Sequence, residues 1–410
     1  MNSRERIKAA LEHAPVDRVP VDFGSHRSSG IMAIAYARLL KALGLADRPV
    51  RVFDVVQQLA IVDEDLLDRF GVDTVELGRG FSREDAAWKE WVLPDGTPCL
   101  VPSWVDLRKE GADWWLCNAE GRKAGVQKSG SLYFDQVFWP YSSGIPEDLS
   151  RIEDAVNSVM WATATPPNAG LIGNDALASG AAAFRASTDR AIVFLFGGSL
   201  YEQAQYLCGT ENLMVWMALE PEKVHALLDA ILDMHLRNLR TLLGAVGPYV
   251  DVVLFGDDFG MQTGPQISMA MYREFYKERE RKLWGEAKRI APIKTLLHCC
   301  GGVRPIIDDF IEVGLDSINP VQTNCAGMDP ASLKHDFGRR ITFWGGGCDT
   351  QAVLPRGIPA EVRAHVLERL PILAEGSGFV FQQIHNIMAN VPSENIVAMF
   401  EAVAEYNRRR

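Results

Sequence analysis

Short apolar runs alternate with longer helical patterns along most of the chain, and this alternation constrains the fold more than any other feature. Runs rich in β-branched and aromatic residues predict buried strands, and the segments between them have the spacing of amphipathic helices. Strands that alternate with helices are typical of a parallel sheet. The pattern predicts eight strands, at residues 18–23, 72–77, 191–196, 250–255, 293–298, 316–319, 341–344 and 379–383.

Eight strands joined by helices fit a closed barrel better than an open doubly wound sheet, which would also need a Gly-rich phosphate-binding turn. The three clearest helical patterns lie at residues 222–243, 269–289 and 361–373. The glycines at 345–347 form a strand-end turn that no helix follows. We therefore predict an α/β fold, a single (β/α)8 TIM barrel over residues 1–410.

Residues 84–141 break this alternation. The segment is rich in tryptophan and has turn signals at Asp95-Gly96 and Glu120-Gly121. Its tryptophans are Trp88, Trp91, Trp104, Trp114, Trp115 and Trp139. Alternating aromatic and polar positions predict a β-meander inserted after the second strand. The insertion is interpreted either as a lid packed on the barrel or as a cap that shapes a substrate pocket or a dimer surface.

Charge and apolar patterning exclude several classes of partner. A formal net charge of -11 argues against nucleic acid, because phosphate binding needs clustered Lys and Arg. No apolar run is long enough to predict a transmembrane helix, and residues 1–6 lack the apolar core of a signal peptide. Seven scattered cysteines, an odd number, argue against a disulfide framework. We expect a cytoplasmic enzyme with reduced thiols and no membrane contact.

Polar groups follow five strands in succession, at the end of a barrel where catalysis usually takes place. We call this end, where the strands finish, the barrel mouth. The groups are Asp257-Asp258, His298-Cys299-Cys300, Asn319 with Gln322, Cys348-Asp349, and Gln383 with His385-Asn386. Packing alone does not explain polar residues at five consecutive strand ends.

His298 and Cys300 are two residues apart on an extended segment, so their side chains share a face. An imidazole and a thiolate are normal zinc ligands, and catalytic zinc takes three protein ligands with one position left open. The position at a strand end favours a metal site over a buried His beside an apolar Cys. The third ligand is His385 or Cys348, which both lie at neighbouring strand ends.

The remaining candidates are carboxyl and amide side chains, each with a functional and a structural interpretation. Asp257 and Asp258 are adjacent, so one is expected to face the mouth as an acid, base or ligand, and the other to cap the following segment. Asn319, Gln322 and Gln383 are candidates for hydrogen bonding to a polar substrate, or equally for stabilising turns.

The sequence also resembles the uroporphyrinogen decarboxylase superfamily, which includes cobalamin-linked methyltransferases. The resemblance covers most of the chain and rests on seven short motifs. They are DRVPV (residues 17–21), FGDDFG (255–260), LHCCG (297–301), INPVQ (318–322), WGG (344–346), HNI (385–387) and VPSENI (391–396). These motifs are specific for the superfamily and not for one activity.

The two branches of the superfamily imply different sites. The resemblance implies that a decarboxylase would need no metal and would hold tetrapyrrole carboxylates with paired arginines near the N-terminus, where this chain has only Arg27. The methyltransferases are implied to bind zinc through a His-x-Cys pair and a late Cys. His298 and Cys300 match the pair, whereas His385 lies where the late Cys would be. The decarboxylases also have a histidine at that place, in a His-Gly-Ile segment.

Zinc-dependent methyl transfer is the function we favour. The resemblance implies a small methyl donor such as a methyl ether, hence O-demethylation, and a cobalamin carried by a separate corrinoid protein, or a thiol as the partner in transfer. A metal-independent decarboxylase of a uroporphyrinogen-like or other carboxylate substrate is the alternative. A binding protein without catalysis on a retained barrel is a third hypothesis. The superfamily is commonly oligomeric, so we expect a homodimer.

Overall fold

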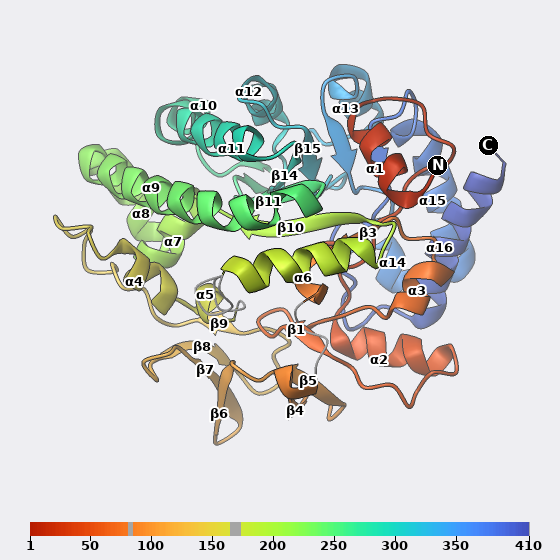
Figure 1. Cartoon of the computed structure of the whole chain (residues 1–410), viewed down its shortest axis with the longest axis horizontal. Helices are drawn as coiled ribbons and strands as arrows, with labels where there is room; N and C mark the ends of the chain where they lie inside the picture. The colour runs from red at the N-terminus through yellow and green to blue at the C-terminus, as the bar shows by residue number, and fades with distance from the viewer. Residues whose placement is uncertain (81–84, 165–173, 410) are drawn as a thin grey trace.

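Seven parallel strands form the centre of the computed structural model, which describes residues 1–80, 85–164 and 174–409. The strands are β3 (Thr74–Glu76), β10 (Ala191–Gly197), β11 (Val252–Gly256), β14 (Lys294–His298), β15 (Ser317–Asn319), β16 (Thr342–Trp344) and β17 (Phe379–Val380). Their order in the sheet is β17-β16-β15-β14-β11-β10-β3. Figure 1 labels five of them, β15, β14, β11, β10 and β3. Neighbours follow one another in sequence, as a barrel requires.

The eighth position is filled by the segment around Val21. Val21 bridges Phe381 in parallel, and the Asp22 amide donates to the Phe381 carbonyl at 2.8 Å. On the other side, the Asp73 amide donates to the Val21 carbonyl at 2.7 Å. The barrel predicted from the sequence is confirmed, although this first strand is reduced to a single bridge. Pro20 has no N–H to donate, which shortens the hydrogen-bonded ladder.

Alternation along the strands creates two cores. Ile192 and Val253 pack outward against the helices, and their neighbours pack inside the barrel with side chains of helix α1 (Ser3–Leu11). The inner core consists of Ile7, Ala10, Leu11, Ala191, Val193, Val252, Leu254, Leu296, Trp344 and Val380. Helix α1 therefore closes the end where the strands begin, which we call the barrel floor, and leaves the mouth for polar side chains.

Helices surround the sheet (Figure 1). Besides α1 they are α2 (Ala33–Ala42), α3 (Glu64–Arg69), α4 (Ile152–Ser158), α5 (Met160–Ala164), α6 (Asn174–Ala186), α7 (Tyr201–Cys208), α8 (Thr210–Leu219), α9 (Pro221–Val246), α10 (Met269–Tyr272), α11 (Glu278–Ile290), α12 (Ile307–Glu312), α13 (Pro330–Phe337), α14 (Val353–Arg356), α15 (Pro359–Leu373) and α16 (Ser393–Arg408). The helix expected at 269–289 contains a π-helical segment, Arg273–Lys277, between α10 and α11. Its consecutive Phe275 and Tyr276 are both buried. No helix in the described part of the chain is long and apolar enough to cross a membrane.

The tryptophan-rich insertion contains antiparallel strands, as expected; its first residue, Glu84, lies outside the described residues. The strands are β4 (Trp88–Val92), β5 (Pro98–Pro102), β6 (Asp106–Glu110), β7 (Asp113–Cys117), β8 (Lys123–Gln127) and β9 (Asp135–Gln136). β4 pairs with β5, and β6 to β9 form a second sheet. A hairpin of β1 (Val52–Asp54) and β2 (Leu59–Ala60) lies before the insertion, and β12 (Gly260–Met261) and β13 (Gly264–Pro265) follow β11.

Two hydrogen bonds place the insertion on the mouth side of the barrel. Gln136 Nε2 donates to the Tyr206 carbonyl on α7 at 2.8 Å. The Tyr133 hydroxyl lies 2.9 Å from the sulfur of Met388, which follows β17. Both partners lie beyond the ends of barrel strands, so this β structure packs against segments that border the mouth.

Candidate metal centre

Three predicted ligands meet at the barrel mouth. His298 ends β14, Cys300 follows it, and His385 lies after β17. One ligand atom from each lies within 4.8 Å of the other two, and all three side chains are half-buried. The Cys300 sulfur is 3.4 Å from His298 Nε2, and the two imidazole rings are 5.6 Å apart. The cluster combines two nitrogens and one sulfur.

Asn319 fixes the orientation of His298. Its side-chain nitrogen donates to the Trp344 carbonyl at 2.8 Å and to Gln382 Oε1 at 3.0 Å. Its oxygen therefore has to face His298 Nδ1, which lies 2.9 Å away and must donate. His298 Nε2 keeps its lone pair and faces Cys300. Such an outer hydrogen bond is usual for a metal-binding histidine.

Asn386 does the same for His385. Its side-chain nitrogen donates to Gln57 Oε1 at 2.9 Å, so its oxygen accepts from His385 Nδ1 at 2.9 Å. His385 Nε2 is then the nitrogen with a free lone pair. Gln57 belongs to the loop between β1 and β2, so a segment distant in sequence sets the tautomer of a predicted ligand.

Burial governs the protonation of all three side chains. It lowers the pKa of His298, and it lowers the pKa of His385 to about 4, with the charge of His298 as the second cause. Both imidazoles are therefore neutral near pH 7, the state that binds a metal. Burial and then the charge of Asp258 raise the pKa of the Cys300 thiol, so a metal that bound there would displace its proton.

Asp257 and Asp258 point in different directions. Asp258 Oδ1 accepts from the Cys300 amide at 2.7 Å and lies 3.7 Å from His298 Nε2. Asp257 accepts from the amides of Leu200, Tyr201 and Glu202 at 2.8 to 3.0 Å. Asp257 thus caps α7, a helix earlier in the chain, instead of the following segment that the sequence suggested. Burial raises the pKa of Asp257 to about 7.

The three amide side chains predicted to bind substrate, Asn319, Gln322 and Gln383, form hydrogen bonds with the protein backbone or with other side chains. Asn319 is fully buried in the contacts above. Gln322 Oε1 accepts from the Gly301 amide, next to Cys300. Gln383 is also buried, and its nitrogen donates to the Gly30 carbonyl at 3.4 Å. These contacts match the turn-stabilising interpretation, and a role in substrate binding stays a prediction.

Cys348 does not belong to the cluster of His298, Cys300 and His385. Its thiol is fully buried, and its recorded partner is the Asp349 carbonyl at 4.0 Å. The glycines before it are packed: a side chain at Gly347 would collide with Phe381. The structure thus places His385, and not Cys348, beside His298 and Cys300. That His385 is the third metal ligand stays a prediction.

Two residues of α7 border the site and were missed by the sequence analysis. Glu202 Oε1 accepts from the Tyr206 hydroxyl at 2.7 Å. Burial, followed by the charges of Asp258 and Asp257, raises the pKa of Glu202 well above its usual value. Glu202 and Tyr206 are spaced i, i+4 at the start of a helix that follows a strand ending at Gly197, and this spacing was the available signal in the sequence.

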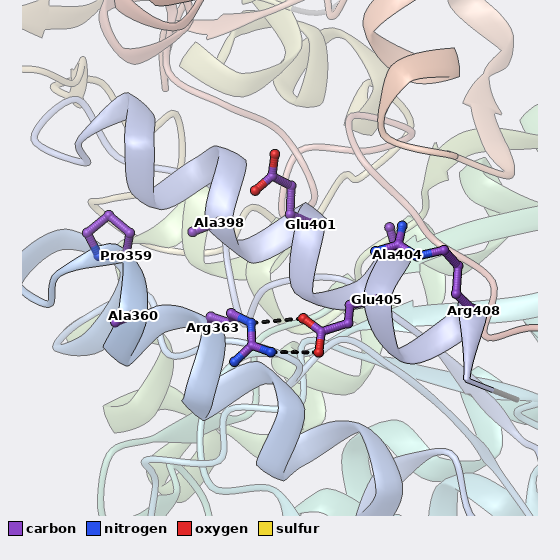
Figure 2. Close-up of a pocket in the computed structure, with 8 residues that line it drawn as sticks. All are labelled: Pro359, Ala360, Arg363, Ala398, Glu401, Ala404, Glu405 and Arg408. Carbon is purple, nitrogen blue, oxygen red and sulfur yellow. Dashed lines mark hydrogen bonds and ion pairs between the residues drawn. The ribbon is translucent and has the colours of Figure 1, made fainter.

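A separate surface groove lies in the outer helix layer, between α15 and α16 (Figure 2). It has a volume of about 440 Å³. Its lining residues are Pro359, Ala360, Arg363, Ala398, Glu401, Ala404, Glu405 and Arg408. Arg363 holds Glu405 by two hydrogen bonds of 2.6 and 2.8 Å across the groove. None of the predicted site residues lines this groove.

Relatives with two different activities match parts of this chain. It is 26% identical over 209 residues to a methylated-thiol–coenzyme M methyltransferase of Methanosarcina mazei, covering 49% of this chain and 50% of that protein. It is 27% identical over 228 residues to a uroporphyrinogen decarboxylase of Methylococcus capsulatus, covering 53% of this chain and 61% of that protein. The chain thus spans about half to three-fifths of the length of these curated relatives.

The fold and the family agree with each other. A solved methyltransferase structure from Methanosarcina mazei aligns with a TM-score of 0.59, covering 99% of both chains at 20% identity, a likeness of fold alone. The family model for uroporphyrinogen decarboxylase (URO-D) matches residues 178–406, which is more than half of the sequence. That match includes the strand ends that bring His298, Cys300 and His385 together, and the chain belongs to the uroporphyrinogen decarboxylase family.

Proposed function

We propose that this protein is a zinc-dependent methyltransferase that moves a methyl group between a small donor, such as a methyl ether, and a corrinoid protein or a thiol. The observation that carries the proposal is the cluster of His298, Cys300 and His385 at the barrel mouth. The likeness to a protein named as a methylated-thiol–coenzyme M methyltransferase supports the reaction class.

The donor set suits zinc. Two neutral imidazoles and one thiolate are ligands that zinc prefers, and three protein ligands leave one coordination position for water or substrate. Both Nε2 atoms are available, because Asn319 and Asn386 engage the opposite nitrogens. A zinc ion bound there would supply a Lewis acid that polarises the methyl donor or favours the thiolate form of a thiol.

The surrounding residues hold this arrangement rigid. Asp258 fixes the backbone of Cys300, and Gln322 fixes the backbone of Gly301, so the turn that carries the thiol has two anchors. Asp258 also faces the cluster with a side chain 30% exposed, which makes it the acidic residue of that pair available to a substrate. Asp257 is engaged by three amides of α7 and has a supporting role.

The methyl-carrying partner would be a separate protein. The superfamily that the chain resembles includes methyltransferases linked to cobalamin, and a separate corrinoid protein is the carrier that this resemblance implies. We therefore propose cobalamin on a separate corrinoid protein as donor or acceptor, a homodimer as the assembly, and the cytoplasm as the location. The β insertion, which packs beside the mouth, would shape the donor pocket.

Metal-independent decarboxylation is the second candidate, favoured by the likeness to decarboxylases and by a histidine at position 385. A porphyrinogen pocket must neutralise several substrate carboxylates with Arg or Lys. The charge of Arg27 acts on His298, and its Nε is already bound to Asp54. In that reaction His385 would be a catalytic residue that donates a hydrogen bond or transfers a proton. The pairing of His298 with Cys300 would have no task, so we rank decarboxylation second.

Metal analysis of wild-type protein beside a Cys300→Ser variant tests the proposal. We expect about one zinc per chain in the wild type, and loss of both zinc and methyl transfer to reduced cobalamin in the variant, with the fold unchanged. Cys348→Ser is the matched control, since it removes a thiol outside the cluster, and it should keep its zinc. Full activity in metal-free protein, or release of carbon dioxide from a porphyrinogen, would contradict the proposal.

A further inference from the structure

Glu202 places a carboxyl group at the mouth, outside the predicted ligand set. It lies in the first turn of α7, directly after β10. Its Oε2 is 4.0 Å from the point where a side chain on Gly256 would begin. Gly256 is paired with His298 in the parallel register of β11 and β14. The carboxyl group therefore lies near the end of β11, the strand next to the one that carries the predicted ligand His298.

The surroundings of Glu202 keep a proton on it. Its partners are the Tyr206 hydroxyl at 2.7 Å and the backbone of Asp258. The other charged groups that act on it, Asp257 and Asp258, are acidic. Within the described residues Glu202 forms no ion pair with Arg or Lys. Burial beside two carboxyl groups favours the neutral acid, and the pKa of Glu202 is raised accordingly.

The fold itself does not need this carboxyl group. Asp257 caps the N-terminus of α7, and the contribution of Glu202 to that cap is its backbone amide. A glutamine would keep the shape of the side chain and the bond to Tyr206. Glu280 is a useful contrast: it also has a raised pKa, but it is 2% exposed and bound to Tyr272 between packed helices. Glu202 is the half-buried acid of the two, and it borders the mouth.

We propose that Glu202 is a catalytic residue, the proton donor to the oxygen that departs when a methyl ether is demethylated; this role rests on the proposed methyltransferase function. The oxygen–methyl bond breaks, and the electron pair of the acceptor nucleophile, the reduced corrinoid or a thiolate, forms the new bond to carbon. The oxygen keeps the electrons of the broken bond and takes the Glu202 proton, which yields an alcohol or phenol. Glu202 is left as a carboxylate and recovers its proton from water.

Glu202 and Asp258 then have separate tasks. Asp258 accepts a hydrogen bond from the Cys300 amide and orders the turn beneath the ligands. Its negative charge helps to keep Glu202 protonated. Glu202 is surrounded by acidic groups, whereas Asp258 accepts a hydrogen bond from a backbone amide and is 30% exposed. Two neighbouring carboxyl groups in such different environments are typical of an active site in which one acts as an acid and the other stays charged.

The test compares wild type with Glu202→Gln on a series of aryl methyl ethers, with reduced cobalamin as acceptor. Demethylation of anisole releases phenolate, a basic leaving group that needs a proton. Demethylation of para-nitroanisole releases para-nitrophenolate, which is stable as an anion. We expect Glu202→Gln to slow anisole about 100-fold, within the usual range for a general acid, and para-nitroanisole by less than about 3-fold. Equal loss on both ethers would overturn the assignment.

Two measurements without turnover complete the test. Zinc content and melting temperature should be the same in wild type and Glu202→Gln, and zinc loss in the variant would instead make Glu202 a ligand. Infrared difference spectra of the zinc-loaded protein should contain the carbonyl stretch of a protonated carboxyl group that Glu202→Gln removes. Its absence at neutral pH would overturn the proposal. If the wild type demethylates no ether although this band is present, the proposed methyltransferase function is wrong, while the observation that Glu202 is protonated still holds.

Discussion

The two ends of the barrel treat buried acidic groups in opposite ways. At the floor, arginines bind the carboxylates that precede the strands. Asp73, before β3, is fully buried and is bound by Arg6 at 2.6 Å and Arg18 at 2.8 Å. Asp251, before β11, is bound by Arg4 at 2.7 Å. Each of these acids also joins the N-terminal segment to the sheet, so the ion pairs close the floor.

At the mouth, the acids have no such partners. Within the described part of the chain, Asp257, Asp258 and Glu202 form no ion pair with Arg or Lys; backbone amides, Tyr206 and a histidine contact them instead. Burial raises the pKa of Asp257 and of Glu202, and groups with shifted pKa values gather at functional sites. The difference indicates that charge stabilises the fold at the floor, whereas the acids at the mouth stay free of ion pairs with Arg and Lys, as the proposed function requires.

Removal of a floor acid should give the largest effect on stability. Asp73→Ala leaves the buried Arg6 without its closer partner and Arg18 without an acid, so we expect the free energy of unfolding to fall by about 3 to 5 kcal/mol. Urea unfolding measures this. Zinc content of the folded fraction should not change. A loss below about 1 kcal/mol would show that the floor ion pairs do not stabilise the barrel.

Removal of a mouth amide should affect metal binding far more than folding. Asn386→Ala deletes the acceptor that orients His385, and we expect zinc affinity to fall about 10- to 100-fold. Competition with a chelator of known affinity measures it. The matched control is Asn407→Ala, because Asn407 bonds to the Val19 backbone at the floor at 2.8 and 3.1 Å. The control should lose stability and keep its zinc affinity; the reverse pattern would remove the distinction between the two ends.

The sequence predicts the barrel because strand formation depends on local patterns. Short β-branched runs and their alternation identified the position of each barrel strand, and the shared face of His298 and Cys300 followed from their spacing alone. The short hairpins β1-β2 and β12-β13 were not predicted. The strand around Val21 is shorter than predicted, because its pairing with Phe381 and Asp73 forms only when the first and last strands of the barrel meet. Local pattern therefore determines the elements, and closure determines how long the first one becomes.

The site was less predictable because its details depend on residues far apart in sequence. Whether His385 or Cys348 lies near Cys300 depends on how β16 and β17 end, and the structure brings His385 there. Asp257 turns away because α7 presents three amides to it. The i, i+4 spacing of Glu202 and Tyr206 is visible in the sequence, but the approach of Glu202 to Gly256 at the end of β11 depends on the tertiary fold.

Lys334 is an exception at the floor, and it gives the smallest and sharpest test. This lysine of α13 is largely buried, and its ammonium group donates to the Ser377 carbonyl instead of to an acid. Burial lowers its pKa from 10.5 to about 8, although the charge of Glu375 acts in the opposite direction. A cation is thus buried at the floor without the carboxylate partner that its neighbours have.

The sign of the pH dependence follows from that pKa. Between pH 8 and 10.5 the unfolded chain holds the Lys334 proton and the folded protein releases it, so the free energy of unfolding should rise with pH across this window. Below pH 8 both states are protonated, and the folded protein bears the whole cost of the buried charge.

Lys334→Met should remove this rise with pH, a difference of about 1 kcal/mol because solvent screens part of the cost. Urea unfolding of both proteins at matched pH cancels other titrations, and nearby His13, whose pKa is lowered from 6.5, titrates below the window. Parallel stability curves would mean that Lys334 finds a partner, and the floor would then have no unpaired buried charge at that position.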